Sequence, residues 1–353
     1  MNDLWKNNLR KIEPYVPGEQ SKDRDIVKIN ANENPYPPSP RAVAALKAFD
    51  TDRLRFYPQA DSLPLKEAIA DFYGVKAENV FVGNGSDDVL ALAFQSFFNG
   101  DKPIAFPDIT YSFYPVWCNL FGIEYTNPAL DESFRINPDD YRAENSGVVI
   151  PNPNAPTSIG EGTEFVEKIL EYNGDCVVII DEAYCDFGGT TSVPLTKKYE
   201  NLLITGTFSK SRSLAGIRIG FAIGSKTLID TLEAVKNSYN SYTIDSLSIA
   251  MGVEAMNDTE YFYKTIEKIK ATRQRVTDEL KALGFDVLDS QTNFIMATHK
   301  DYDIKEMFEY LKANKIFIRY FNQPRINKYV RITIGTNEEM DKLLQGVKDF
   351  INR

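Results

Sequence analysis

One lysine in this chain of 353 residues stands in a setting that favours covalent chemistry. Lys210 follows the apolar segment 202–204 and lies within the sequence Thr-Phe-Ser-Lys-Ser-Arg-Ser. A lone lysine in a loop is usually a solvated surface charge. Apolar and small neighbours instead favour partial burial, and burial disfavours the charged form, so that the free amine can attack a carbonyl group.

Hydroxyl groups and a cation accompany this lysine. Thr207 and Ser209 lie close before it, and Arg218 follows at the start of a strand predicted over 217–223. Hydroxyls and a guanidinium are common ligands of a phosphate group. A reactive amine beside a phosphate site suggests a phosphorylated aldehyde held as a Schiff base, which describes pyridoxal phosphate.

A second candidate phosphate site precedes the first in the chain. The short strand predicted at 80–82 runs into the sequence Gly-Asn-Gly-Ser-Asp, and a helix is predicted over 89–98. The start of a helix presents free N–H groups and a positive dipole end, which together can hold a phosphate. The same pattern is also typical of an ordinary turn with a capping residue. The phosphate site is favoured here because the aldehyde proposed to bind Lys210 carries a phosphate group that must be held nearby.

The overall composition limits the class of protein. The length allows two domains, and the hydrophobic fraction of 43% and the charged fraction of 25% are those of an ordinary globular protein. The net charge of -10 argues against non-specific binding of nucleic acid. Three cysteines without metal-ligand spacing and one histidine argue against a disulfide framework and against a metal site. We expect that histidine, His299, to lie at the surface where a strand ends.

Two further features concern location. No apolar run approaches the length of a membrane span. The first eleven residues are charged and polar, without the apolar core of a signal peptide. We therefore expect a cytoplasmic protein that does not bind a membrane.

Strands and helices alternate from residue 80 onward. Buried runs such as 177–180 lack polar alternation, as parallel strands do. This order predicts an α/β fold with a mostly parallel sheet covered by helices on both faces. After residue 224 the pattern changes to helices and short strands, which predicts a smaller α+β domain. We expect an arm at 1–38 that packs with the small domain, a large domain at 39–245 and the small domain at 246–353.

Ligands of such sheets bind beyond the carboxyl ends of the strands, and four predicted strands end near polar side chains. In chain order the strands lead to Tyr111, to Asn154, to Asp181 with Tyr184, and to Lys210. For each residue alone, a cap or a turn is the more common explanation. The coincidence of a ring, an amide, a carboxylate with a phenol and a lysine favours one shared site.

The small domain carries arginines in apolar strands. Arg319 lies in a strand predicted over 316–320, and Arg331 lies in one predicted over 330–334. An arginine inside a strand is seldom fully buried unless it is paired. One explanation is an internal ion pair with an acidic residue, and the other is recognition of anionic substrate groups. Arg325, in the intervening loop, is expected to be solvated.

Several segments resemble, in the same order, those of the class I and II, fold-type-I pyridoxal-phosphate aminotransferases, and most of all the histidinol-phosphate aminotransferases. They are Asn-Ala-Asn-Glu-Asn-Pro-Tyr at 30–36, Arg-Phe-Tyr-Pro at 55–58, Gly-Asn-Gly-Ser-Asp at 83–87, Asp-Glu-Ala-Tyr at 181–184, the Ser-Lys to Arg stretch at 209–218 and Val-Arg-Ile-Thr at 330–333. The resemblance covers nearly the whole chain. It implies a homodimeric enzyme of histidine biosynthesis whose active site is shared between subunits, with ping-pong transfer between histidinol phosphate, a phosphorylated amino alcohol, and 2-oxoglutarate.

The resemblance also implies a role for each matched residue. Lys210 forms the Schiff base and acts as the base, Asp181 pairs with the ring nitrogen, and Tyr184 bonds the 3′-oxygen. The other cofactor-binding residues are a stacking ring, Tyr111; the phosphate ligands Gly85, Ser86, Asp87, Thr207, Ser209 and Arg218; and Tyr57 from the neighbouring subunit. The substrate-binding residues are Arg331 for the carboxylate, Arg319 and Tyr15 for the phosphate, and Asn32.

One segment departs from the family pattern. The family commonly has Asn-Pro-Thr-Gly, whose asparagine bonds the 3′-oxygen, whereas this chain has Ala155 and Ser158 at the asparagine and glycine positions. Asn154, one residue earlier, is the candidate replacement. The alternatives within enzymes are an aromatic or broad-specificity aminotransferase and a threonine-phosphate decarboxylase of the same fold.

Two other classes of protein remain as alternatives. A cofactor-binding regulator would usually carry a fused DNA-binding segment, for which the short arm before Asn30 leaves no room. A structural α/β protein with a surface lysine would bind no cofactor, so an absorbance spectrum of the purified protein distinguishes it from an enzyme.

Overall fold

A seven-stranded sheet forms the centre of the larger part of the molecule in the computed structural model, which describes residues 4–15, 25–142 and 144–353. The strand order is β2-β8-β7-β6-β5-β3-β4. The bounds are β2 (Val80–Gly83), β3 (Ile104–Ala105), β4 (Tyr125–Thr126), β5 (Gly147–Pro151), β6 (Val177–Asp181), β7 (Leu202–Thr207) and β8 (Gly220–Gly224). The pairs among β3 to β7 are parallel, and β8 runs antiparallel to both of its neighbours.

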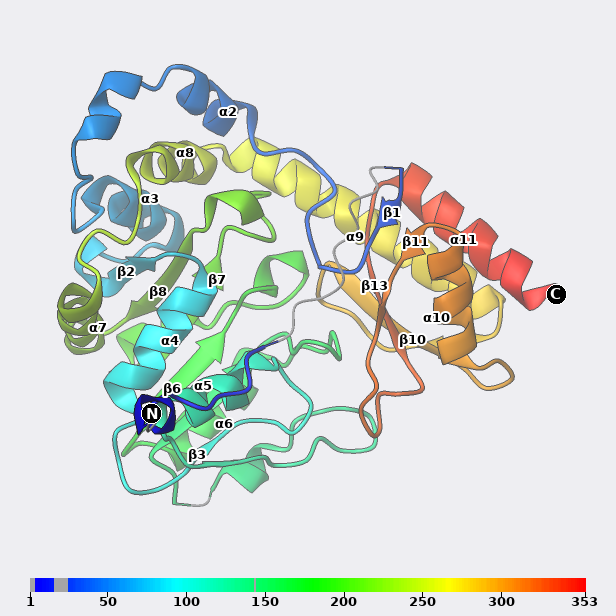
Figure 1. Ribbon diagram of the computed structural model, residues 1–353, viewed down its shortest axis with the longest axis horizontal. Helices are drawn as coiled ribbons and strands as arrows, with labels where there is room; N and C mark the ends of the chain where they lie inside the picture. Colours follow the sequence, from blue (N-terminus) through cyan, green and yellow to red (C-terminus); the bar gives the residue numbers. More distant parts are fainter. Residues whose placement is uncertain (1–3, 16–24, 143) are drawn as a thin grey trace.

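Helices cover both faces of this sheet (Figure 1). Alternate strand residues enter different cores: Ile180 and Ile204 pack on one face, while Ile179 and Leu203 pack on the other. The helices are α2 (Pro40–Lys47), α3 (Leu63–Tyr73), α4 (Ser86–Phe97), α5 (Phe113–Phe121), α6 (Thr163–Tyr172), α7 (Lys226–Tyr239) and α8 (Ser246–Asn257). Because the central strands are buried on both sides, they are nearly continuous apolar runs, which is the pattern of a covered α/β sheet.

A smaller part contains an antiparallel sheet of order β12-β13-β10-β9. Figure 1 shows α9 running from the large part along this sheet. The bounds are α9 (Thr259–Ala282), β9 (Phe285–Val287), β10 (Phe294–His299), α10 (Ile304–Ala313), β11 (Ile316–Phe317), β12 (Arg319–Tyr320), β13 (Val330–Thr333) and α11 (Asn337–Ile351). The arm contributes a short helix, α1 (Leu4–Asn7), and β1 (Val27–Lys28), which pairs in parallel with β11.

Short 3-10 helices connect several of these elements. They are η1 (Thr51–Arg55), η2 (Ala77–Asn79), η3 (Pro138–Tyr141), η4 (Cys185–Phe187), η5 (Val193–Lys197) and η6 (Ala215–Ile217). Within the described residues, no helix combines the length and the apolar character that a membrane span needs.

Three elements differ from the sequence prediction in ways that affect the site. The helix expected over 89–98 begins at Ser86, so its first turn includes the Ser-Asp pair. The strand expected over 217–223 begins at Gly220, because Arg218 adopts a left-handed backbone with φ 57° that no strand allows. The strand expected over 316–320 is split between two sheets, as β11 and β12.

His299 is buried, contrary to the expected surface position. Its Nε2 lies 3.2 Å from the carbonyl oxygen of Leu283, and its Nδ1 accepts a hydrogen bond from the backbone N–H of Asp301. Its ring also packs on Phe285 and Tyr302. The residue therefore ties the end of β10 to the end of α9.

The helix α8 bears on the boundary between the two parts. It packs against α2 and α3, and its Met251 and Ala255 belong to the core beside the large sheet. We therefore propose that the large domain extends through Asn257 rather than ending at 245, because a domain is defined by the core that its elements share.

Candidate active site

Two adjoining cavities lie at the carboxyl ends of β6 and β7. The inner cavity, of about 210 Å³, is lined by Asp181, Tyr184, Lys210, Arg218 and the start of α4. The outer cavity, of about 400 Å³, shares Tyr184, Lys210 and Arg218 with the inner one and extends to the small sheet. The strand ends therefore bring the predicted carboxylate, phenol and lysine to one place, as parallel neighbouring strands do.

Lys210 is half-buried between these cavities, as its apolar and small neighbours predict. Its Nζ lies 3.4 Å from the carbonyl oxygen of Ala31 and 5.6 Å from the centre of the Tyr184 ring. No carboxylate among the described residues forms an ion pair with it. The amine is thus directed at the cavities without an acidic partner to hold its charge.

Asp181 is the last residue of β6 and is buried. Its Oδ2 accepts a hydrogen bond from Tyr114 at 3.0 Å, and its Oδ1 accepts from the N–H of Ala183 at 3.2 Å and from the hydroxyl of Thr205 at 3.3 Å. Burial raises the pKa of Asp181 to about 6, and these hydrogen bonds limit the rise. Within the described residues it has no cationic partner, so a positively charged ring nitrogen fits beside it.

The start of α4 and the Lys210 loop form a cradle for an anion. Ser86, Thr207 and Ser209 line the inner cavity with hydroxyl groups. Gly85 has φ 88°, and a Cβ at this position would lie 2.5 Å from Nη2 of Arg218. The glycine therefore allows the guanidinium to approach the helix start, where N–H groups already favour a phosphate.

Asp87 takes a different part from the one expected for a phosphate ligand. Its Oδ2 pairs with Arg218 at 3.1 Å, and its Oδ1 accepts a hydrogen bond from the hydroxyl of Tyr111 at 2.7 Å. A carboxylate repels a phosphate, so only the backbone of Asp87 suits such a ligand. The side chain instead positions Arg218 and the Tyr111 ring.

Asn154 does not line either cavity, contrary to its predicted place as a replacement for the family's asparagine. It is 2% exposed, and its Nδ2 donates to the carbonyl oxygen of Ile109 and to Thr157. Its Oδ1 accepts from Thr110. Because these bonds use the whole amide to join two loops, the residue at the cavity wall is Ala155.

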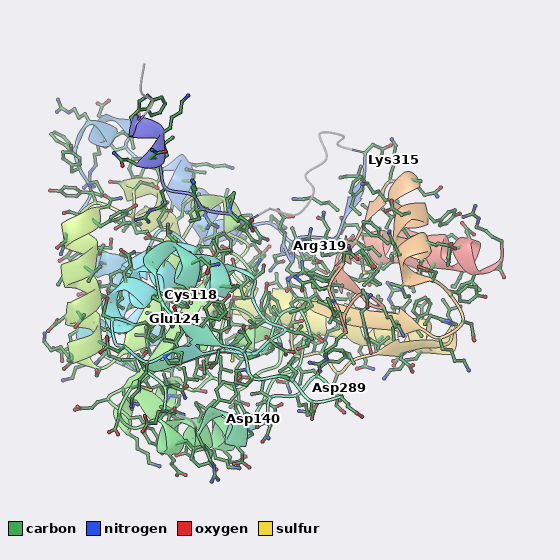
Figure 2. All side chains as sticks on the ribbon, turned by 60° about the horizontal axis from the view of Figure 1, so that its bottom comes forward. Cys118, Glu124, Asp140, Asp289, Lys315 and Arg319 are labelled. Carbon is green, nitrogen blue, oxygen red and sulfur yellow. The ribbon has the colours of Figure 1, made fainter. Side chains whose placement is uncertain are left out.

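Arg319 and Arg331 occupy paired positions on β12 and β13, and both line the outer cavity. Figure 2 shows Arg319 at the junction of the two parts of the molecule. Neither has an acidic partner among the described residues, which argues against the internal ion pair. Nη2 of Arg331 donates to the carbonyl oxygen of Asn30, but its buried Nε has no partner. Burial and the neighbouring Arg319 lower the pKa of Arg331, so an anion bound here would relieve both effects.

One aromatic and one amide side chain, both from the arm, complete the outer cavity. Tyr15 lines it and stacks on Phe113 with ring centres 4.2 Å apart. Asn32 also lines it, and its Nδ2 donates to the hydroxyl oxygen of Tyr184 at 2.9 Å. Both predicted substrate residues of the arm thus reach the same cavity as the arginines.

Arg325 is exposed, as expected, but its guanidinium is also bound to the large part of the molecule. It donates to Asp108 at 2.8 Å and to the carbonyl oxygens of Leu130 and Asp131 at 2.7 and 2.8 Å. These bonds fasten a loop of the small part to the large part, and they leave Arg325 out of the two cavities.

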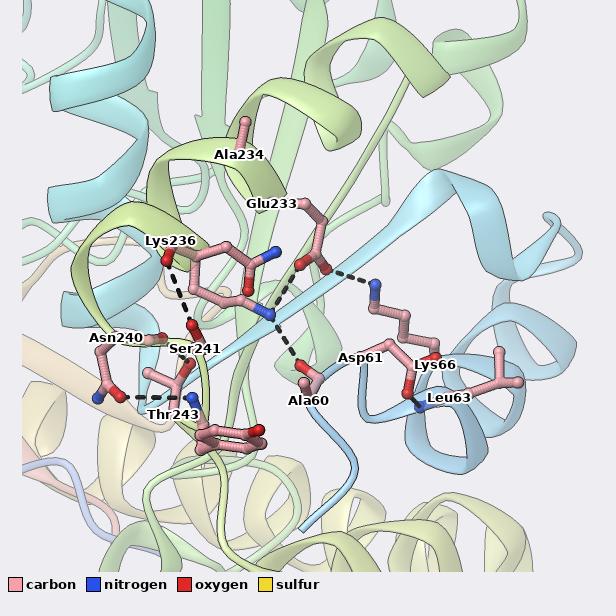
Figure 3. A network of polar contacts seen from close by, with 12 residues as sticks. Ala60, Asp61, Leu63, Lys66, Glu233, Ala234, Lys236, Asn240, Ser241 and Thr243 are labelled. Carbon is pink, nitrogen blue, oxygen red and sulfur yellow. Dashed lines mark hydrogen bonds and ion pairs between the residues drawn. The ribbon is translucent and has the colours of Figure 1, made fainter. Parts of the chain in front are cut away.

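Tyr57 lies outside both cavities of its own chain. It is 81% exposed and stacks on Tyr242. The segment that follows it is fixed by a buried network (Figure 3), in which Nζ of Lys236 donates to the carbonyl oxygen of Ala60 and pairs with Glu233. Glu233 also pairs with the buried Lys66. The exposed tyrosine therefore lies close to a segment that hydrogen bonds hold to α7.

Sequence analysis missed two residues that hold Asp181. Thr205 precedes Thr207 by two positions on β7, so both side chains point to the same face of the strand, and this spacing is a usable signal. Tyr114 lies at the start of α5, three residues after Tyr111. Nothing in the sequence indicates that its hydroxyl reaches Asp181 at the end of β6.

The raised pKa of Asp181 predicts how the stability of the cofactor-free protein depends on pH. Between its ordinary pKa of 3.8 and about 6, the folded state holds a proton that the unfolded state has lost, so stability falls as pH rises. The free energy of unfolding, relative to Asp181→Asn, should therefore fall by about 2 kcal/mol between about pH 4 and pH 7. Denaturant unfolding of both proteins measures this difference, and a constant difference over that range would contradict the assignment.

Comparison with known proteins places the chain in a family. Residues 24–347 match the family Aminotransferase class I and II. The chain is 48% identical over 351 residues to histidinol-phosphate aminotransferase 1 of Hydrogenovibrio crunogenus, with 99% of each chain covered. It is 50% identical over 351 residues to the histidinol-phosphate aminotransferase of Acinetobacter baumannii strain SDF, with 99% of this chain and 97% of that one covered. The chain belongs to the histidinol-phosphate aminotransferase family. This membership confirms the predicted class of enzyme.

Solved structures confirm the predicted fold. The histidinol-phosphate aminotransferase of Sinorhizobium meliloti in complex with pyridoxal-5′-phosphate has a TM-score of 0.84 at 23% identity, with 92% of this chain and 90% of that one covered. The aspartate aminotransferase of Thermus thermophilus with maleate has a TM-score of 0.78 at 20% identity, with 92% and 91% covered. At such identities the likeness concerns the fold: a mostly parallel seven-stranded sheet with a smaller antiparallel part.

Proposed function

We propose that this chain transfers an amino group between histidinol phosphate and 2-oxoglutarate, with pyridoxal phosphate as its cofactor. The observation that carries the proposal is one pair of adjoining cavities that holds a half-buried lysine, a buried unpaired carboxylate, an anion cradle and two arginines without acidic partners. When bound, the cofactor supplies an aldehyde and a ring that draws electrons from the reacting carbon.

The inner cavity fits this cofactor group by group. Asp181 would pair with the ring nitrogen, Tyr184 would donate to the 3′-oxygen, and the Tyr111 ring would lie against the cofactor ring. The backbone of residues 85–87, the hydroxyls of Thr207 and Ser209 and the guanidinium of Arg218 would hold the phosphate. Support comes from the lining of the cavity and from the close approach of Arg218 to the glycine that opens α4.

Lys210 would act on the substrate itself. Its Nζ would take the proton that the substrate loses from the carbon bearing the amino group. The amine lies beside the Tyr184 ring and has no acidic partner among the described residues, so no ion pair draws it away from the cavities.

The outer cavity would bind the anionic ends of both substrates. Arg331 would take the carboxylate of glutamate, and Arg319 with Tyr15 would take the phosphate of histidinol phosphate. The two guanidinium groups come from facing positions of neighbouring strands, so either anion can be held beside the same reacting carbon. Asn32 would line the path between the two cavities.

Substitution of Arg319 tests the phosphate site. Arg319→Ala should raise KM for histidinol phosphate about 10- to 100-fold, because charge-assisted hydrogen bonds to the phosphate are lost, and should change KM for glutamate much less. Arg135→Ala, which removes an exposed arginine paired with Glu161, is the control. Equal effects of Arg319→Ala on both substrates would count against a phosphate role.

The related activities are separated by a substrate panel on the purified enzyme. An aromatic or broad-specificity aminotransferase would accept donors without phosphate at comparable kcat/KM. A threonine-phosphate decarboxylase would release carbon dioxide from its substrate. We expect instead the highest kcat/KM for the phosphorylated donor without carbon dioxide release, because two guanidinium groups without acidic partners among the described residues favour a substrate with an anion at this end.

We further propose a cytoplasmic homodimer in which Tyr57 of one subunit reaches the cofactor phosphate of the other. Its exposure, and that of the neighbouring Phe56 and Leu54, suits a surface that a second copy covers. The molar mass in solution tests this arrangement, and a monomer with full activity would contradict it.

A further inference from the structure

Thr333 holds the side chain of Asn32 in one of its two possible orientations. The Oγ1 of Thr333 accepts a hydrogen bond from the backbone N–H of Asn32 at 3.0 Å and donates one to Oδ1 of Asn32 at 3.1 Å. The opposite end of the same amide, Nδ2, donates to the hydroxyl oxygen of Tyr184 at 2.9 Å. We propose that Thr333 is a positioning residue that directs the amide of Asn32 so that the hydroxyl proton of Tyr184 stays free for the bound cofactor.

The orientation of the amide decides where the tyrosine proton goes. As it stands, Tyr184 accepts from Asn32, and its own O–H remains available to the cavity. A turned amide would present Oδ1 to Tyr184 and would take that proton for itself. The hydroxyl proton of Thr333 would then lose its acceptor, at a site where Thr333 is 3% exposed. An unsatisfied buried donor is costly, so the threonine selects the observed orientation.

The backbone of Asn32 is held as firmly as its side chain. Asn32 is 2% exposed and has φ 55°, a left-handed conformation that asparagine tolerates better than most residues. Nδ2 of the fully buried Asn293 donates to its carbonyl oxygen at 3.0 Å. Thr333 is the last residue of β13, and Asn293 directly precedes β10. The small domain therefore fixes a residue of the arm against Tyr184.

This inference rests on the proposed function, in which Tyr184 donates to the 3′-oxygen of pyridoxal phosphate. A hydrogen bond from Asn32 makes Tyr184 the better donor, and that donor stabilises negative charge on the cofactor oxygen. If Asn32 is released, that charge is stabilised less, so the bound cofactor binds its proton more tightly. The pH midpoint of the cofactor absorbance should then move upward.

The experiment titrates the absorbance of the cofactor-loaded enzyme between about pH 5 and pH 9. Thr333→Val, which keeps the shape and removes the hydroxyl, should raise the midpoint by about 0.5 pH unit. Thr333→Ser keeps the hydroxyl and should leave the midpoint near the wild-type value. Thr265→Val is the matched control, because Thr265 is equally buried but its hydroxyl bonds only the backbone of its own helix.

A second variant tests the orientation directly and serves if Thr333→Val does not fold. Asn32→Asp replaces the donor that faces Tyr184 with an acceptor, and it should raise the midpoint more than Thr333→Val does. The role of Thr333 would be overturned if the midpoint shifted in Asn32→Asp but stayed at the wild-type value in Thr333→Val. It would also be overturned if Thr333→Val and Thr265→Val shifted the midpoint equally. A wild-type protein without cofactor absorbance would overturn the proposed function, and this inference with it.

Discussion

Amino transfer is expected to fall roughly 10⁴-fold or more when Lys210 is replaced by alanine, because the substitution would remove the residue proposed as both the covalent anchor of the cofactor and the base. Lys210 is the single lysine among the described residues that line the inner cavity. The outer cavity adds Lys28, but its Nζ is already paired with Glu33 at 2.6 Å. Arg218 cannot substitute as a base, since a guanidinium does not give up its proton in proteins.

Two measurements check this expectation. The absorbance of the lysine-bound cofactor should be lost, and single-turnover transfer from histidinol phosphate should become undetectable on the wild-type time scale. Lys226→Ala is the control, because it removes an exposed lysine that pairs only with Asp230 within α7. Turnover of Lys210→Ala at the wild-type rate would exclude the proposed mechanism.

Proton removal is expected to slow by about 10²- to 10³-fold in Asp181→Asn, the second largest effect. The carboxylate is buried and receives three hydrogen bonds, but among the described residues no cation neutralises it. A ring nitrogen bound beside it would keep its proton because the opposite charge is close. The neutral amide keeps the shape but loses this charge, so the ring would draw electrons less strongly.

Glu182→Gln is the matched control for this substitution. Glu182 is the next residue in the chain, and burial raises its pKa to about 7. Its carboxylate faces away from the inner cavity and accepts hydrogen bonds from Thr191 and from the N–H of Ser192. Single-turnover rates should fall for Asp181→Asn and stay near wild type for Glu182→Gln. Similar losses in both would mean that any buried carboxylate in this region matters only for folding.

The side chains at the strand ends were predictable because each directly follows an apolar run that the sequence itself displays. Asp181 and Lys210 each follow an apolar run, and the carboxyl ends of neighbouring parallel strands lie at one edge of a sheet. Knowing the two strands was therefore enough to expect the two side chains in one cavity. The arginines of β12 and β13 were also predictable as candidates, because an arginine within an apolar strand needs a partner for its charge.

Several contacts lay beyond such reasoning. Asn154 looked available for the cofactor, but the loops at Ile109 and Thr157 use its amide. Arg325 is exposed, as expected, but it also binds three oxygens of the large part, which the sequence did not indicate. These outcomes depend on which loops meet after folding, and a sequence pattern describes only neighbours along the chain.

The sequence by itself predicted the fold class and singled out Lys210, Asp181 and the candidate phosphate ligands, because apolar periodicity and short segments mark them. Only the tertiary structure decided which polar atoms remain available to a ligand. Asn32 and Thr333 show the difference, since they are 301 residues apart and yet their contact sets the direction of one amide. Hydrogen-bond direction in a buried site depends on every partner present, and those partners come together only when the arm, the large sheet and the small sheet have packed.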